Sequence, residues 1–409
     1  MTTLTASIEA ERKPASISAA RVVLAALAFV VLMQLHLAFT KAINWDEYWH
    51  YSLITASLRG EEVPFLQTPY IPLFSWVTQL PMAPIEQITL IRAFILAFEV
   101  VAAIAVYFAA RRFTDHLTAL LCALAYVTAG YAFLHGFALR ADVIAAAFLT
   151  SALAVGLRAK VNLVNAALIG LLLILAVLST IKSVLWAPAF IAVLVLRADE
   201  LPASRSIVIT ALCGVLALVA GFFLFGGEAA ENAMGTISRS SERMFSAGLF
   251  PLGGYFLKQL IFAPFFTALM GVLVYWLVRG QAERKVKIAL ALLAAPLLTV
   301  VFYRNSFPYY FAFIMPPVAI AIAPAIEIAV RRYGAAMMTA VLVLGAITLN
   351  VVEKRDRLDT QRQLQTQLRT VFPKPVIYID ESGMLGDYPR AALRFTSGWS
   401  LQRYWDDGE

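Results

Sequence analysis

Two neighbouring carboxylates, Asp46 and Glu47, follow the first apolar run of the chain in the segment NWDEYWHYSL. A carboxylate that is partly removed from water can act as a general base near neutral pH, because desolvation raises its pKa. In a helix over about 45–59, Asp46 and His50 share a face at i and i+4. Helix capping by Asn44 and Asp46 is the simpler alternative, but it explains one acid and not the pair.

His50 could instead ligate a metal ion together with Asp46. No D-x-D, H-E-x-x-H or cysteine set in the sequence supplies the remaining ligands, and both cysteines lie inside apolar runs. We therefore expect no cofactor, with a divalent metal as the less favoured alternative and a packed or hydrogen-bonding His50 as the favoured one.

Three cations stand in short links between apolar runs: Arg140 in LHGFALRADV, Lys182 in STIKSVLWAP and Arg304 in FYRNSFPYYF. The planar fork of an arginine suits a phosphate group. Simpler explanations are an Arg140–Asp142 pair at a helix end, a lysine that snorkels to headgroups, and an aromatic belt that includes Tyr309. Taken with the acidic pair, the cations predict a site for an anionic lipid and a hydroxyl nucleophile.

The composition indicates a membrane protein. Of the 409 residues, 61% are hydrophobic and 14% are charged, against about 25% charged in soluble domains. The net charge of +7 comes from basic clusters between apolar runs, which is a topology pattern rather than a nucleic-acid footprint. We therefore expect lipid as the solvent of most of the chain.

About eleven apolar runs approach the length of a membrane-spanning helix. They are 21–40, 88–110, 115–134, 142–157, 161–178, 183–196, 206–226, 256–278, 288–303, 308–330 and 335–351. If all cross, the basic clusters share one side, the cytoplasm. The sequence predicts an all-α polytopic protein with a cytoplasmic N-terminus (1–20), a membrane catalytic domain (21–351) and an extracytoplasmic tail (352–409).

Three segments fall on the predicted outer side. The first outer loop, 41–87, is expected to hold interfacial helices, one over about 45–59 and a short one ending near Leu80. Loop 227–255, with Arg239, Arg243 and the following Lys258, is expected to form a lid. The tail should contain a polar helix over 353–369 and a short strand over 376–380, and it either docks on the bundle or belongs to a longer fold.

The D-E pair after the first run, the aromatic helix, G-x-x-x-P-F and P-Y-x-P-L-F-x-W resemble the first outer loop of C-superfold (GT-C) glycosyltransferases. The similarity is greatest to the protein O-mannosyltransferase and aminoarabinose transferase branch, glycosyltransferase family 39-like, and extends over about 21–330. The R-A-D and T-I-K segments occur where those enzymes keep equivalent motifs. One departure is Gln67-Thr68-Pro69-Tyr70, where aminoarabinose transferases carry K-P-P, so donor or acceptor recognition should differ.

The resemblance implies transfer of a hexosyl or pentosyl group from a polyprenyl-phosphate donor to an acceptor outside the cytoplasm. Asp46 and Glu47 would be the catalytic residues: Asp46 would activate the acceptor hydroxyl, with Glu47 beside it and with inversion at the anomeric carbon. Substrate binding would fall to seven residues, of which Arg140, Lys182 and Arg304 would hold the lipid phosphate: His50, Tyr70, Arg140, Asp142, Lys182, Arg304 and Tyr309. The expected partners are the lipid donor, an envelope glycan, lipid or protein as acceptor, and membrane lipids, with no nucleic acid. The expected location is the bacterial inner membrane, with the active site on the periplasmic or extracellular side.

Two alternatives remain. A transporter or flippase for a lipid-linked sugar should place charges at mid-membrane and show paired broken helices in two halves. We expect the charges at the outer helix ends and see no repeat, which favours the enzyme. An O-antigen polymerase or ligase would use a diphosphate donor in place of a monophosphate one.

Overall fold

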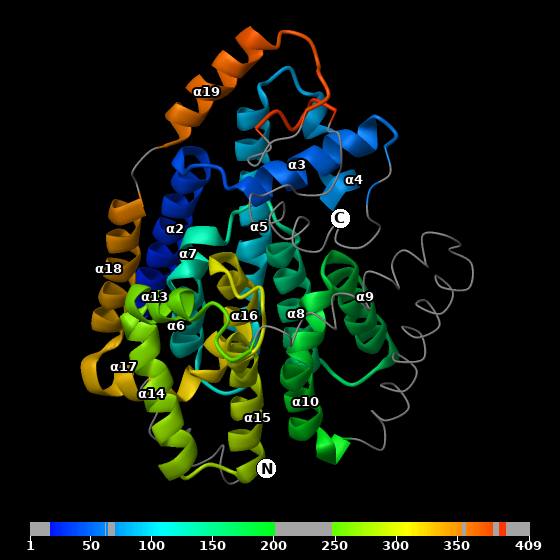
Figure 1. The fold of residues 1–409 in the computed structure, drawn as a ribbon. Helices are drawn as coiled ribbons and strands as arrows, with labels where there is room; N and C mark the ends of the chain where they lie inside the picture. Colours follow the sequence, from blue (N-terminus) through cyan, green and yellow to red (C-terminus); the bar gives the residue numbers. More distant parts are fainter. Residues whose placement is uncertain are drawn as a thin grey trace.

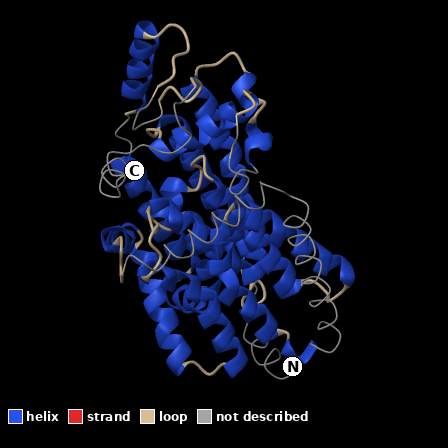
Figure 2. Ribbon diagram, turned by 45° about the vertical axis from the view of Figure 1, so that its right-hand side comes forward, coloured by secondary structure: helices blue, strands red, loops and turns tan. Residues whose placement is uncertain are grey.

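The computed structural model describes residues 17–61, 63, 70–200, 248–353, 357–378 and 384–389. Across these residues the protein is built of helices joined by loops, and no strand occurs (Figure 2). The predicted all-α architecture is therefore confirmed for this part of the chain. The predicted strand over 376–380 is not: Tyr378 forms an isolated bridge, and residues 379 and 380 lie outside the described ranges.

A bundle of long apolar helices forms the body of the molecule (Figure 1). Helix α8 packs between α5 and α9, α16 lies against α5, α7 and α8, and α2 is covered by α5, α6 and α18. The bounds of these helices are α2 Ile17–Thr40, α5 Pro84–Ala110, α6 His116–Val127, α7 Tyr131–His135, α8 Ala141–Arg158, α9 Leu163–Ser179, α16 Pro308–Ala321 and α18 Ala335–Glu353.

The remaining elements lie around this core. They are η2 Ile181–Trp186, α10 Ala187–Leu196, η3 Ala198–Glu200, α13 Gly253–Phe262, α14 Pro264–Arg279, α15 Arg284–Ala294, η4 Ala295–Val301 and α17 Ala323–Tyr333. At the top of Figure 1, a separate group caps one end of the bundle, here named the α3 end. It comprises α3 Trp45–Leu58, α4 Tyr70–Phe74, η1 Val77–Gln79 and α19 Leu358–Val371.

Two runs predicted as single spans are broken in the structure. The axis bends by 96° between α13 and α14 and by 63° between α16 and α17. Pro264 and Pro324 stand in the first turns after these breaks; proline lacks the N–H that would bond to the preceding turn, and its ring clashes there. Prolines 188 and 296 likewise follow the changes from η2 to α10 and into η4.

The predicted run 115–134 also divides, into α6 and α7. Gly130 between them has φ +55°, and Gln259 of α13 occupies the space where a Cβ would stand. The Gln259 side chain accepts from Tyr131 N at 2.8 Å and donates to Ala129 O at 3.2 Å. A glycine turn held by a buried amide thus ends α6 early.

Four described helices are long and apolar enough to cross a membrane: α2, α5, α8 and the stretch beginning with α18. The number rises to six if each bent pair is one span, and shorter apolar helices accompany them. The expected number of eleven is thus not confirmed, and the run 206–226 lies outside the described residues. The turn between α14 and α15 and the end of α10 lie at the opposite end from α3 (Figure 1).

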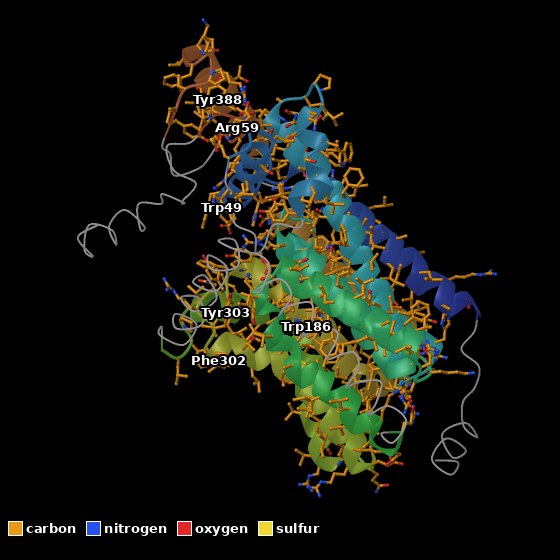
Figure 3. The ribbon with its side chains drawn as sticks, turned by 90° about the vertical axis from the view of Figure 1, so that its right-hand side faces the viewer. Trp49, Arg59, Trp186, Phe302, Tyr303 and Tyr388 are labelled. Carbon is orange, nitrogen blue, oxygen red and sulfur yellow. The ribbon has the colours of Figure 1, made fainter. Side chains whose placement is uncertain are left out.

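The tail docks on the α3 end, as one of the two sequence-based alternatives predicted. The Gln361 side chain of α19 accepts from Ile43 N at 2.8 Å and donates to Ile43 O at 2.9 Å. Thr55 Oγ1 donates to Gly386 O at 2.6 Å, and Arg59 donates to Asp387 O at 3.0 Å. Figure 3 shows Arg59 beside Tyr388 at this contact. Helix α3 is therefore held between the bundle and the tail.

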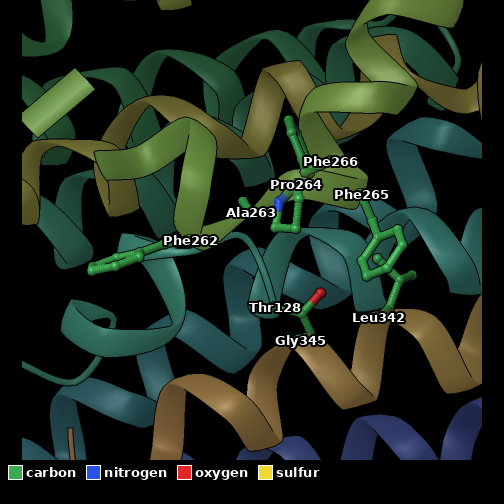
Figure 4. A pocket seen from close by; sticks show the side chains of 8 residues that line it. All are labelled: Thr128, Phe262, Ala263, Pro264, Phe265, Phe266, Leu342 and Gly345. Atoms are coloured by element: carbon green, nitrogen blue, oxygen red, sulfur yellow. The ribbon is translucent and has the colours of Figure 1, made fainter. Parts of the chain in front are cut away.

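A small pocket lies at the bend between α13 and α14 (Figure 4). Its walls are mainly apolar and include Phe262, Phe265 and Leu342, with the Thr128 hydroxyl beside them. None of the residues predicted for substrate binding or catalysis lines it. The predicted catalytic residues lie instead at the start of α3.

Candidate active site

A capping box places both carboxylates at the start of α3. The side chain of Asn44 accepts from Asp46 N at 2.9 Å, and Asn44 N donates to Glu47 Oε1 at 3.1 Å. Asn44 is thus the cap, which leaves the Asp46 carboxylate for other contacts. Asp46 is 8% exposed and Glu47 is 3% exposed. Two acids in the first turn also suit the positive end of the helix dipole.

Glu47 is held by four donors. Arg92 of α5 donates from Nε to Glu47 Oε2 at 2.7 Å and from a terminal nitrogen to Oε1 at 2.6 Å, and Leu139 N donates to Oε2 at 2.9 Å; Asn44 N is the fourth. Burial alone would raise the pKa of Glu47, but the Arg92 charge and these hydrogen bonds hold it below its usual value. The remaining Arg92 donors reach the carbonyls of Ala38, Lys41 and Ala42.

Asp46 begins a chain of ion pairs. It accepts from a terminal nitrogen of Arg140, whose Nε donates to Asp142 Oδ2 at 3.1 Å. Lys182 Nζ donates to Asp142 Oδ1 at 2.7 Å. The Tyr309 ring centroid lies 3.2 Å from the Arg140 guanidinium carbon and 5.7 Å from Lys182 Nζ. We name this group the ion-pair chain: Asp46, Arg140, Asp142 and Lys182, with the Tyr309 ring against its two cations.

The ion-pair chain and the Tyr309 ring are supplied by four elements: α3, the start of α8, η2 and α16. Arg140 is the N-cap of α8, and Asp142 lies in its first turn, where the helix dipole favours an acid. Lys182 lies in η2, after the Thr180 cap. Tyr309 lies in the first turn of α16, next to Pro308. Helix ends that meet at the α3 end of the bundle therefore assemble the ion-pair chain from elements that are far apart in sequence.

His50 and Tyr70 pack beside this group. His50 Nδ1 lies 2.5 Å from the Tyr70 hydroxyl, and the two rings meet edge to face. Burial lowers the pKa of His50 well below its usual value, and the positive charge of Arg140 adds to the effect. The imidazole is therefore neutral at neutral pH and serves as a hydrogen-bonding group.

The other predicted residues have different outcomes. Arg304 is half-buried in the turn between η4 and α16, the helix that carries Tyr309. Lys258 lies on α13 with its ammonium 5.8 Å from the Tyr255 ring centroid. Arg239, Arg243 and the part of the expected lid up to residue 247 lie outside the described ranges. Within those ranges no group of three or more His, Cys, Asp or Glu side chains is arranged to hold a metal ion, and a cofactor-free reaction stays a prediction.

Sequence reasoning missed Arg92 and Glu99. Both lie inside the apolar run 88–110 and both are buried in the structure, with 1% and 0% exposure. An ionisable residue within a predicted span is itself a signal of a specific role, and it could have identified them. The expectation that charges lie only at the outer helix ends is wrong for Glu99, which is near the middle of α5.

Comparison with known proteins gives structural matches only. No protein-family model and no curated protein sequence matches the chain. ArnT from Cupriavidus metallidurans, solved bound to undecaprenyl phosphate, superposes with a TM-score of 0.62 at 11% identity, over 97% of this chain and 92% of ArnT.

An oligosaccharyltransferase of Archaeoglobus fulgidus is also similar. Its apo form matches with a TM-score of 0.52 at 16% identity, over 85% of this chain and 58% of that one. AglB from the same organism, in complex with an inhibitory peptide and a dolichol-phosphate, matches with a TM-score of 0.50 at 14% identity, over 81% and 55%. This chain thus spans little more than half of the oligosaccharyltransferase.

Matches at this level of identity establish the fold. Together with the apolar helices, they show that the chain is an integral membrane protein. The predicted architecture is confirmed: the protein has the GT-C fold shared by ArnT and AglB.

Proposed function

We propose that the protein is a glycosyltransferase that moves a sugar from a polyprenyl-phosphate donor to an acceptor hydroxyl. The observation that carries this proposal is the ion-pair chain, in which Asp46 of α3 pairs with Arg140 at the start of α8, and Asp142 links Arg140 to Lys182 of η2. It is supported by the similarity, over nearly the whole of both chains, to ArnT bound to undecaprenyl phosphate.

Arg140 and Lys182 are placed to receive the donor phosphate. Each now binds carboxylate oxygens, and phosphate oxygens accept the same hydrogen bonds with the same sign of charge. When a phosphate takes over the N–H that Arg140 gives to Asp46, the Asp46 oxygen becomes open to the acceptor hydroxyl. Donor binding and exposure of the base are thereby linked through one guanidinium.

The reaction then proceeds by direct displacement. Asp46 takes the proton of the acceptor hydroxyl while the oxygen of that hydroxyl bonds to the anomeric carbon of the sugar. The bond from that carbon to the phosphate oxygen breaks, the electron pair stays on the phosphate, and the configuration inverts. Arg140 and Lys182 stabilise the charge that develops on the leaving phosphate. The reaction as proposed requires no cofactor.

Glu47 has a different role from the one expected beside Asp46. Because its two oxygens are occupied by four donors, it holds the start of α3 against α5 and against Leu139. We assign it to positioning, whereas Asp46 contacts the substrate. His50, Tyr70, Asp142, Tyr309 and Arg304 remain assigned to substrate binding.

The acceptor is proposed to be an envelope lipid, glycan or protein on the periplasmic face of the bacterial inner membrane. The test compares lipid A, glycans and secreted proteins by mass spectrometry in cells with and without the gene. We expect one class of molecule to lose a sugar, and the wild-type gene to restore it. The Asp46→Asn gene should not restore it, whereas Asp359→Asn, a change at an exposed acid of α19, should. Restoration by Asp46→Asn would refute the assignment of the base.

A further inference from the structure

A carboxyl and an amide meet inside the bundle. Glu99 of α5 and Gln34 of α2 are both fully buried. Gln34 Nε2 donates to Glu99 Oε2 at 2.8 Å and to the Phe133 carbonyl of α7 at 3.2 Å. A polar contact therefore joins α2, α5 and α7 inside the bundle.

This contact leaves one oxygen without a partner on each side chain. Within the described residues, neither Glu99 Oε1 nor Gln34 Oε1 has a hydrogen bond, and a polar atom that is buried without a partner lowers the stability of the fold. An ionised carboxylate offers acceptors only, so these two oxygens cannot satisfy each other. A proton on Glu99 Oε1 turns that atom into a donor, which is the partner that an unpaired acceptor such as Gln34 Oε1 requires.

The surroundings of Glu99 also argue against a charge there. No ion pair of the described chain includes it, and Tyr126 of α6, which is uncharged at neutral pH, is a titratable side chain near it. An ionised carboxylate buried without a cation is strongly disfavoured, in protein interiors and in membranes alike. A neutral acid removes this cost.

Glu99 also contacts the link between α7 and α8, residues 136–140. A Cβ added to Gly136 would overlap the Glu99 carboxyl group, so the acid packs directly on the backbone of the link. Further along the same link, Leu139 N donates to Glu47, and Arg140 begins the ion-pair chain. The link is therefore contacted by two carboxyl groups, one bound by Arg92 and one without a cation.

We propose that Glu99 is a protonated carboxylic acid paired through two hydrogen bonds with Gln34, and that this pair positions the 136–140 link and with it Arg140. Glu99 touches no reacting group and is thus a positioning residue. The protonation of Glu99 is inferred from its burial and contacts alone. The inference that it positions Arg140 for substrate rests on the proposed function.

Infrared spectroscopy of the full chain in lipid nanodiscs tests the protonation. We expect a carboxylic-acid carbonyl band that persists between about pH 6 and about pH 9, where ordinary carboxyl groups are ionised. Glu99→Gln should remove this band. The control Glu327→Gln removes an acid that is paired with Arg331 and should leave the band in place. Identical spectra for the wild type and Glu99→Gln would overturn the proposal.

Binding of undecaprenyl phosphate tests the positioning. Glu99→Ala should raise its Kd by about 3- to 30-fold, and Glu99→Gln, which keeps the shape and the pairing with Gln34, should restore it. Gly136→Ala keeps the acid but displaces the link, and it should weaken binding as well.

Thermal unfolding of each variant separates positioning from folding. A Glu99→Ala protein that unfolds at a lower temperature yet binds undecaprenyl phosphate as the wild type does would refute the positioning role. A Glu99→Gln protein as impaired as Glu99→Ala would refute the neutral acid. A wild type that does not bind this lipid would contradict the proposed function and the positioning role, while the infrared result would still decide the protonation.

Discussion

Two arginine–carboxylate pairs lie side by side at the start of α3. They differ in how deeply they are buried and in whether the arginine is held by one acid or shared between two. In the Arg92–Glu47 pair the side chains are 1% and 4% exposed, and all five N–H groups of Arg92 are bonded. In the Arg140–Asp46 pair they are 10% and 11% exposed, and Arg140 shares its charge between two acids. We therefore call the Arg92–Glu47 pair the anchor, and we propose that Asp46 can exchange its contact with Arg140 for one with substrate.

The largest expected effect is the loss of turnover when Asp46, and not the anchoring Glu47, is changed. Asp46→Asn should lower kcat by about 10²- to 10⁴-fold, because it removes the proton acceptor. Its unfolding temperature should stay near that of the wild type, since the amide keeps an oxygen for Arg140. Turnover of the purified protein with a polyprenyl-phosphate sugar measures the first quantity, and Asp359→Asn is the control. An unchanged kcat would show that Asp46 is not the base and that the two pairs do not differ in function.

The anchor should respond in stability instead. Arg92→Leu leaves Glu47 buried without its cation and should cost about 3–5 kcal/mol in the free energy of unfolding. The double variant Arg92→Leu with Glu47→Leu should recover part of this loss, because it removes the stranded charge. Denaturant unfolding in detergent measures both. A single variant as stable as the wild type would show that the pair is not an anchor.

A conservative change at the other arginine tests the exchange. Arg140→Lys keeps the charge but loses the fork that reaches Asp46 and Asp142 together, so undecaprenyl phosphate should bind about tenfold more weakly. Arg158→Lys, at the far end of the same helix, serves as the control. Equal affinity in Arg140→Lys would mean that a point charge suffices at this position.

The smallest effect concerns pH. Burial and Arg140 hold the pKa of His50 well below 6.5 in the folded protein, so the unfolded chain takes up a proton first as pH falls. The stability that neutral His50 contributes is present above about pH 6.5 and is lost progressively below it. His50→Gln should flatten the decline of the unfolding temperature on acidification, whereas Tyr70→Phe, which keeps the imidazole, should not. An equally steep decline in His50→Gln would contradict this.

The sequence was sufficient for some features because their causes are local. Asn44 and the acids after it specify the start of α3, and the apolar runs specify the bundle. The tight links that hold Arg140 and Lys182 could be read from the gaps between these runs. The meeting of those two cations with Asp46 and Tyr309 depends on how helix ends pack, which no spacing in the chain encodes.

Other features could not be predicted from periodicity. The bend at Ala263 follows from Pro264 and from Gln259, whose side chain bonds to a turn on another helix. The different roles proposed for Asp46 and Glu47 depend on Arg92, which lies within an apolar run and whose partners are distant in sequence. Tertiary partners of this kind decide what a motif residue does.

The attachment of the tail to α3 has a consequence for biosynthesis. Ile43 and Thr55 emerge early from the ribosome, but their partners Gln361 and Gly386 are translated more than three hundred residues later. During insertion into the bilayer, the segment that carries Asp46 therefore lacks its contacts with the tail until the tail has been synthesised. If the proposed function is correct, the nascent chain should stay inactive until α19 has been delivered, and a half-assembled protein would not act on its lipid-linked substrate.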